Sequence, residues 1–235
     1  MKTLSSINNS FKVFTDTYSY LKKSEDKTLD MSDLKTQWAI QILNRLHVEF
    51  EIIGKISEKP ATLFLGNHIS YLDIPLLMAT AKNISFVAKH ELNAWPVFGK
   101  AARKVDTVFV KRENGDSRKS ARLSINEALQ KGKRVAIFPS GTTCMHENKV
   151  WRKGAFEIAH ELNIWVQPFR ISYTPLRAAA YIDQDFFPIH LYNLSGFEQI
   201  QAKIEFHKPV KIENPIQSCE EWQSWSRGLI NGIDN

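Results

Sequence analysis

A histidine and an aspartate five residues apart carry the clearest chemical signal in this 235-residue chain. His68 and Asp73 follow the apolar run 63–65, which ends at a Gly-Asn pair. On a regular helix, residues five apart lie about 140° apart around the axis, so these side chains would not share a face. They can meet if His68 lies in a loop and Asp73 in the first turn of the next helix. A carboxylate that holds one ring nitrogen leaves the other free to take a proton, as a general base must.

The same two residues also have an ordinary structural interpretation. A histidine after a strand is commonly a capping or surface residue, and an aspartate in a first helical turn complements the helix dipole. The apolar run before Gly66 predicts a buried strand that ends in a loop, and such loops often carry chemistry. The spacing alone therefore leaves both interpretations open.

Strands and helices alternate through the middle of the chain. This alternation predicts an α/β fold, with a central mixed sheet flanked by helices. Helices are expected after Asp30, at the apolar residues 76–78, from 116 or 117 to 131, along 155–162, and from a Ser218–Glu221 capping box onward. Strands are expected at 48–52 (half-buried), 63–65, 84–88, 107–110, 135–138, 164–173 and 203–210.

Three of these strands end in polar loops. One loop carries the histidine, one Lys111 and Arg112, and one the segment 140–143. Ligands of open α/β sheets bind at such carboxyl ends, so we expect the loops to surround one cleft. Backbone N–H groups of Gly141 and Thr142 could then bind an anion or a developing oxyanion. The two cations also fit a solvated strand end, and the third loop an ordinary turn.

The charge of the chain is uneven. The formal net charge is +6, and residues 89–153 hold 15 Lys and Arg against 6 Asp and Glu, a local +9. A basic middle suits phosphate-bearing ligands or an anionic membrane surface, and it also fits a solvated basic face. No zinc-finger spacing, aromatic RNA-binding motif or continuous basic helix is present, so nucleic acid is not expected as a partner.

Composition also bears on location and on metals. Cys144 and Cys219 lack metal-ligand spacing, which indicates reduced thiols in a cytoplasmic protein. The pair His146-Glu147 has no second histidine at the required spacing, so no metal site is predicted. No apolar run reaches the ~18 residues of a membrane span, and no signal-peptide core is found. We therefore predict a peripheral protein on the inner face of the membrane.

Residues 1–30 are predicted to form a helical, membrane-associating segment, ahead of a single domain at 31–235. An aromatic stripe at helical spacing, with lysines nearby, is typical of a helix at a membrane interface. A helix packed on the core of the domain explains the pattern equally well. The stripe consists of Phe11, Phe14, Tyr18 and Leu21.

Several motifs together resemble the glycerolipid acyltransferase family, the lysophosphatidic acid acyltransferases and their relatives. An Asn-His pair, four variable residues and then Asp form the first motif of that family, and all are present at 67–73. Residues 108–112 resemble the second motif, and residues 138–143 resemble the third, normally Phe-Pro-Glu-Gly-Thr followed by Arg or Thr. Residues 153–156 and 166–168 match two further stretches. The order and spacing agree over roughly residues 35–213.

This resemblance implies an O-acyltransferase that moves an acyl chain from a thioester to a lysolipid hydroxyl without an acyl-enzyme. The implied donor is acyl-CoA or acyl-carrier protein, as a co-substrate and with no other cofactor. His68 would be the general base and Asp73 its orienting partner. Arg112 matches an arginine implicated in holding the phosphate of the acceptor. The substrate-binding residues implied by the resemblance are Asn67, Ser70, Lys111, Arg112, Ser140, Gly141, Thr142 and Thr143.

The third motif departs from the family at two positions. Ser140 replaces the glutamate of the family, and Thr143 stands where many members carry an arginine that grips phosphate. Thr143 occurs in a subset that resembles the lyso-ornithine lipid acyltransferases. The acceptor is therefore a lysolipid of another head group, or the enzyme is impaired, or the protein binds lipid on this fold without catalysis. A serine hydrolase is excluded, because Ser140 lacks the first glycine of a nucleophile elbow.

Overall fold

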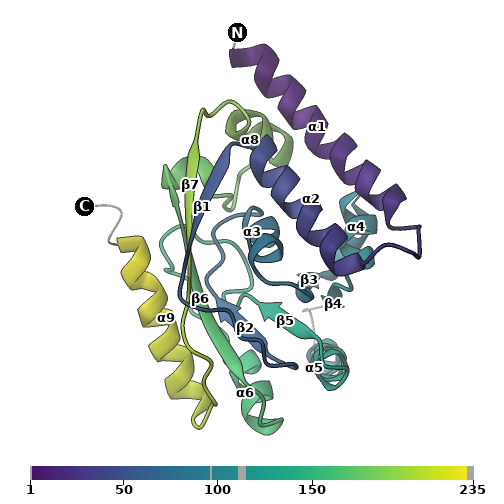
Figure 1. Ribbon diagram of the computed structural model, residues 1–235. Helices are drawn as coiled ribbons and strands as arrows, with labels where there is room; N and C mark the ends of the chain where they lie inside the picture. The colour runs from purple at the N-terminus through teal and green to yellow at the C-terminus, as the bar shows by residue number, and fades with distance from the viewer. Residues whose placement is uncertain (1, 96, 111–114, 232–235) are drawn as a thin grey trace.

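A mixed, seven-stranded sheet forms the centre of the computed structural model, which describes residues 2–95, 97–110 and 115–231 (Figure 1). The strand order is β1-β7-β6-β2-β5-β3-β4, and all neighbours are parallel except β6 and β7. The predicted α/β class with a mixed sheet is confirmed. The strands are β1 (Val48–Ile53), β2 (Leu63–Gly66), β3 (Ile84–Lys89), β4 (Val108–Val110), β5 (Arg134–Ile137), β6 (Val166–Thr174) and β7 (Ile200–Phe206).

Helices cover both faces of the sheet, with α1 to α4 on one side and α9 on the other (Figure 1). Each face has its own apolar core, one built mainly with α2, α3 and α8 and one with α5, α6 and α9. The helices are α1 (Lys2–Lys23), α2 (Met31–Arg45), α3 (Asp73–Thr80), α4 (Phe98–Lys104), α5 (Gly115–Gln130), α6 (Gly154–Glu161), α7 (Leu176–Ala179), α8 (Phe187–Leu194) and α9 (Pro215–Asn231), with a 3₁₀ helix η1 (His90–Ala94).

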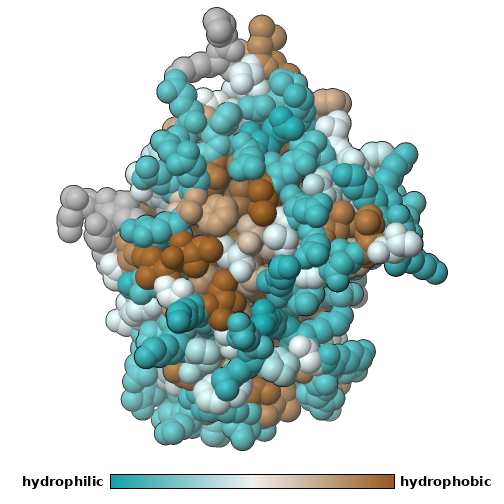
Figure 2. Space-filling view, viewed as in Figure 1, coloured by the Kyte–Doolittle hydropathy of each residue, from teal (hydrophilic) through white to brown (hydrophobic). Residues whose placement is uncertain are grey.

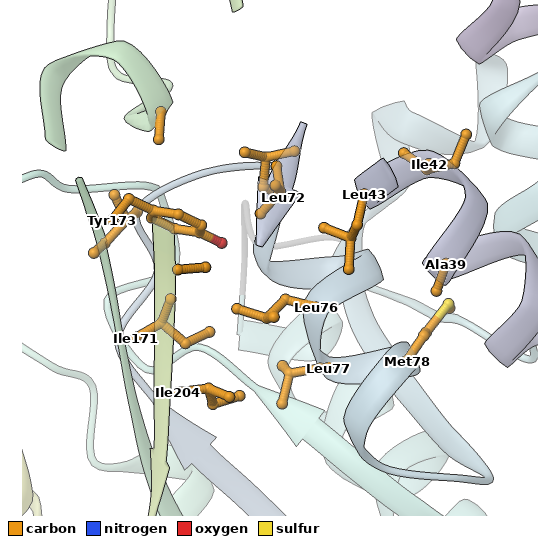
Figure 3. Packing of buried hydrophobic residues seen from close by; sticks show 14 of the residues in the cluster. Ala39, Ile42, Leu43, Leu72, Leu76, Leu77, Met78, Ile171, Tyr173 and Ile204 are labelled. Carbon is orange, nitrogen blue, oxygen red and sulfur yellow. The ribbon is translucent and has the colours of Figure 1, made fainter. Parts of the chain in front are cut away.

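Packing between α2, α3 and the sheet holds α3 in its position. Leu43 of α2 and Leu76 of α3 are buried beside Ile171 and Ile204 of the sheet (Figure 3). Asp30 caps α2, because its side chain accepts hydrogen bonds from two backbone N–H groups of the first turn. The predicted start of this helix after Asp30 is confirmed, and the core it forms holds α3 against β2 and β6.

The exposure of β1 and the ends of β7 and α9 differ from the prediction. Phe50 and Ile52 of β1 are exposed, because β1 is an edge strand, so the half-buried assignment is wrong. The strand expected at 203–210 is β7, which begins at Ile200 and ends at Phe206. The capping box predicted at Ser218 is also wrong, because Asn214 caps α9 about one turn earlier, with its side-chain oxygen accepting from the Ile216 and Gln217 N–H groups.

The N-terminal helix α1 lies along α2, α4 and α8 (Figure 1). Val13 and Thr17 are buried, and an ion pair between Asp16 and Arg45 joins α1 to α2. The opposite face of α1 is exposed, with Phe11 66% exposed. One face of α1 therefore packs on the domain, as one interpretation of the aromatic stripe predicts. The other face is exposed, as a helix at a membrane interface requires. In the described ranges no helix is long and apolar enough to cross a bilayer.

Candidate active site

The histidine and the aspartate meet as their spacing predicts. Strand β2 ends at Gly66, α3 begins at Asp73, and His68 lies in the intervening loop. His68 Nδ1 lies 2.7 Å from Asp73 Oδ2, and the carboxylate is buried while the His68 side chain is 19% exposed. A carboxylate only accepts hydrogen bonds, so Nδ1 carries the proton and Nε2 is the nitrogen left to take one.

Four hydrogen bonds hold the Asp73 carboxylate in place. Oδ2 also accepts from the backbone N–H groups of Ile69 (2.8 Å) and Ser70 (3.1 Å), and Oδ1 accepts from the Tyr173 hydroxyl (2.7 Å). Burial and the neighbouring Asp73 raise the pKa of Tyr173 well above its usual value, so this hydroxyl remains a donor. A buried carboxylate with this full set of donors is fixed and satisfied, which in turn fixes the imidazole.

The tyrosine gives a direct test of this arrangement. Tyr173→Phe removes a hydrogen bond to a buried carboxylate, so we expect a loss of about 1.5–3 kcal/mol of unfolding free energy. The acyl-transfer rate should fall as well, because Asp73 then holds His68 less rigidly. Denaturant unfolding and steady-state rates measure both effects. Tyr192→Phe, a half-buried tyrosine on α8, is the matched control and should change neither. A fully active and fully stable Tyr173→Phe would contradict the role of this bond.

Other residues of the loop bind the sheet. The Asn67 amide donates to the Ile171 carbonyl and accepts from the Ile171 N–H, both at 2.7 Å. Ser70 Oγ accepts from the Leu72 N–H, and both Asn67 and Ser70 are fully buried. A Cβ on Gly66 would lie 2.4 Å from the Phe169 carbonyl oxygen, so only glycine allows β6 to come this close. Asn67 and Ser70 thus shape the loop around His68, and neither side chain reaches its surface.

The third motif lies beside the first, because β2 and β5 are parallel neighbours. The Cys144 N–H donates to the His68 carbonyl at 2.7 Å, which ties the two loops together. Ser140 is buried and its Oγ donates to the Thr142 carbonyl at 2.8 Å. Gly141 has a φ of 74°, and its N–H donates to the Phe138 carbonyl at 3.0 Å.

The expected anion site is therefore wrong for Gly141, whose N–H is already bonded within the turn. Two of the three predicted loops do converge, since Gly141, Thr142 and Thr143 line the same cavity as His68. Lys111 and Arg112, which follow β4, lie outside the described residues.

An apolar cavity of about 460 Å³ is lined in part by His68. Phe138 stacks on the imidazole of His68, with ring centroids 4.0 Å apart and an angle of 12° between the ring planes. This stacking helps to fix the orientation of the imidazole. The cavity lies between helices α1, α2, α3 and α4, which supply most of its lining. A space of this shape and polarity suits a hydrocarbon chain. Its apolar lining includes Val13, Leu21, Leu34, Trp38, Met78 and Phe98.

Tyr71 lines the cavity near α8, and His190 lies behind it. The His190 Nε2–H donates to the Ala180 carbonyl, so its Nδ1 accepts from the Tyr71 hydroxyl, at 2.9 Å in each case. Burial lowers the pKa of His190 and raises that of Tyr71, which keeps both groups neutral. In the part of the chain that the structure describes, no cluster of His, Cys, Asp and Glu is arranged to hold a metal ion.

Sequence reasoning did not identify Tyr173 as part of the site. Strand alternation places it on the same face as Phe169 and Ile171, and a buried tyrosine hydroxyl needs a partner. The alternation therefore indicates that the Tyr173 hydroxyl makes a hydrogen bond in the core on that face of the sheet. The partner itself depends on the pairing of β6 with β2, which the local pattern does not specify.

Comparison with known proteins establishes the class of protein to which this fold and site belong, the acyltransferases. The family model Acyltransferase matches residues 47–172, more than half of the chain, and the chain belongs to this family. The family resemblance of the motifs is thereby confirmed, and with it the assignment of an acyltransferase.

Two curated relatives and one solved structure illustrate the relationship. The chain is 35% identical over 179 residues to lyso-ornithine lipid O-acyltransferase of Pseudomonas aeruginosa, covering 74% of this chain and 68% of that protein. It is 34% identical over 103 residues to 1-acyl-sn-glycerol-3-phosphate acyltransferase of Neisseria meningitidis, covering 43% of this chain and 40% of that one. The crystal structure of the LPA acyltransferase PlsC from Thermotoga maritima shares the fold, with a TM-score of 0.74, 16% identity and coverage of 100% and 98%.

Proposed function

We propose that the protein transfers an acyl chain from an acyl thioester to the hydroxyl of a lysolipid, in membrane lipid synthesis. One observation carries the proposal: His68, held by Asp73, lines an apolar cavity. His68 Nε2 takes the proton of the hydroxyl as its oxygen attacks the thioester carbonyl. The tetrahedral intermediate then collapses, the carbon–sulfur bond breaks, and the imidazolium returns the proton to the leaving thiolate. Proton removal of this kind contributes roughly 10²–10⁴-fold.

The acyl donor in this proposal is acyl-CoA or acyl-carrier protein. Lys89 and Lys104 are exposed and also border the cavity, so they place positive charge at its rim. Both donors suit that charge, because coenzyme A carries phosphates and the carrier is an acidic, phosphopantetheinylated protein. Arg112, with Lys111, remains assigned by the family resemblance to an anionic group of the substrate.

The acceptor is proposed from the third motif. Thr143 lines the cavity at a position where many family members carry an arginine, so this pocket lacks that cation. An acceptor with a bare phosphate would lose its partner there, whereas an amino-acid or neutral head group would not. The relatives include enzymes named for lyso-ornithine lipid as well as for 1-acyl-sn-glycerol-3-phosphate. We therefore favour a lysolipid whose head group is not a phosphate monoester.

A panel of acceptors tests this choice. Purified protein is incubated with acyl-CoA or acyl-carrier protein and with lyso-ornithine lipid, a neutral lysolipid or lysophosphatidic acid, and the products are identified by mass spectrometry. We expect lyso-ornithine lipid to react at least about tenfold faster than lysophosphatidic acid, a difference of roughly 1.4 kcal/mol. Thr143→Arg should reduce this rate difference, because the added cation can bind the phosphate of lysophosphatidic acid.

The same panel addresses lipid binding without catalysis. That alternative rests on Ser140, which in the structure is a buried turn residue bonded to the Thr142 carbonyl and does not line the cavity. A wild-type protein that acylates no lysolipid with either donor would favour the non-catalytic alternative and overturn the proposed function.

We also propose that the exposed face of α1 contacts the membrane, at its inner, cytoplasmic side. Phe11 and Tyr18 of the predicted stripe point outward, and Figure 2 shows apolar surface at the N-terminal end of this helix. The other two predicted contacts are wrong in their direction: Phe14 packs on Phe98 of α4, and Leu21 lines the cavity. The outward stripe instead continues toward the N-terminus and comprises Leu4, Ile7, Phe11 and Tyr18.

A further inference from the structure

A lysine lines the apolar cavity at a place that the proposed chemistry does not use. Lys35 of α2 is partly buried and borders the cavity together with Met31 and Leu34 of the same helix. In the described ranges, no hydrogen bond or ion pair holds its ammonium group. Burial is the largest influence on the pKa of this lysine and lowers it, so the group is partly removed from water. A cation in an otherwise apolar wall calls for an explanation.

Contacts of the neighbouring residues place Lys35 at the end of α3 that lies away from His68. Helix α3 begins directly after the loop that carries His68. At the other end of α3, the Met78 carbonyl accepts a hydrogen bond from the Thr36 hydroxyl, at 3.3 Å. Figure 3 shows Met78 beside Ala39, which follows Lys35 by about one turn of α2. The imidazole and the ammonium group therefore line the cavity at opposite ends of α3.

The lining between these two ends is apolar. Helices α2 and α3 and strand β3 supply it, with Trp38, Ile42, Pro75, Met78 and Phe86 among the side chains. The methylene groups of a lysine stem are apolar as well, so the polarity changes at the ammonium group itself. A hydrocarbon chain that reached this group would displace the water around it and offer no hydrogen bond in exchange.

We propose that Lys35 limits the length of the acyl chain that the enzyme transfers. The inference rests on the proposed function, in which the thioester carbonyl lies at His68. The chain extends from there along α3, and its methyl end stops before the ammonium group. The chain concerned is that of the donor, because a water-soluble thioester brings a chain that must be sheltered from water. The chain of the lysolipid can remain in the bilayer.

Removal of the charge should let the cavity take a longer chain. Lys35→Met keeps an unbranched apolar side chain and removes the ammonium group. Each further methylene that becomes buried favours the bound chain about fourfold. We therefore expect donors two carbons beyond the wild-type limit to gain about tenfold in kcat/KM. Lys35→Arg keeps the positive charge and should keep the limit.

The test measures kcat/KM for a series of acyl thioesters that differ by two carbons, each with the same lysolipid. Wild type, Lys35→Met and Lys35→Arg are compared with the control Lys82→Met. Lys82 is exposed beside Asp33 at the same end of α3 and does not line the cavity, so this control should match wild type. Circular dichroism shows whether each variant is folded, and Lys35→Leu is a second uncharged variant.

Several results would overturn the inference. One is a Lys35→Met profile with the wild-type limit, whether at full activity or with an equal loss for every chain. Another is a wild type that shows no limit, or a limit that follows the chain of the lysolipid and not that of the donor. A shift in Lys82→Met equal to that in Lys35→Met would also contradict it. Failure of the proposed function is distinguishable, because it would appear as full activity of a His68→Ala variant or as a wild type without transfer activity.

Discussion

Replacement of His68 by alanine is expected to lower acyl transfer about 10²–10⁴-fold, and to cost about 1.5–3 kcal/mol of unfolding free energy because the buried Asp73 carboxylate loses one donor. The reason is that this side chain is partly exposed at the cavity and Asp73 holds its Nδ1, so Nε2 is the group placed to take the proton of the acceptor. Steady-state rates with the best lysolipid, together with denaturant unfolding, measure the two quantities. His207→Ala is a suitable control, because His207 packs against Trp222 of α9. A His68→Ala protein with full activity would refute the general-base assignment.

Asp73→Asn should lower the transfer rate severely and should also lower the unfolding free energy, by an amount that depends on how many donors lose their acceptor. The carboxylate accepts three hydrogen bonds at Oδ2 and one at Oδ1, and the amide nitrogen of asparagine cannot accept the bonds of the oxygen that it replaces. Each buried donor left without an acceptor costs about 1–3 kcal/mol. We therefore expect a reduced unfolding free energy together with a severe loss of transfer, and denaturant unfolding and steady-state rates measure the two effects.

Substitution of two outward residues of α1, Ile7→Ser with Phe11→Ser, is expected to weaken vesicle binding strongly. Both side chains are exposed, so their loss leaves the fold intact. Burial of each in a bilayer is worth about 1.5–3 kcal/mol, and the pair together about 3–6 kcal/mol, or roughly 10²–10⁴-fold in partitioning. Sedimentation with vesicles rich in anionic lipid measures this directly.

The matched control for the membrane variant is Leu123→Ser with Ile216→Ser, which removes two exposed apolar side chains from α5 and α9. This control should bind vesicles as wild type does. Added salt should weaken the binding that remains in the α1 variant, since lysines supply the rest of the attraction. Equal binding by the α1 variant and the control would show that another surface holds the membrane.

Local patterns were enough to predict much of the architecture. The apolar run before Gly66, the break after it and the position of Asp73 predicted the strand, loop and helix around His68, and Asp30 marked the start of α2. Each of these features depends on residues only a few positions apart. The predicted α/β sheet followed from the same short-range alternation.

The features that were missed depend on distant pairing. Tyr173 joins the site only because β6 pairs with β2, the strand that leads into the His68 loop. The edge position of β1, which exposes Phe50, follows from strand order and not from local alternation. No periodicity within α1 indicated that Val13 would line the cavity of the active site.

The loop that carries His68 also has a consequence for folding. Asn67 bonds to Ile171 and Asp73 to Tyr173, residues 104 and 100 positions further along the chain. Contacts of such long sequence separation form only after a large part of the chain has been ordered, and they slow folding. The nascent chain therefore has no catalytic geometry until β6 is added beside β2. Because the site depends on these contacts with β6, we expect heat inactivation to coincide with unfolding of the whole sheet.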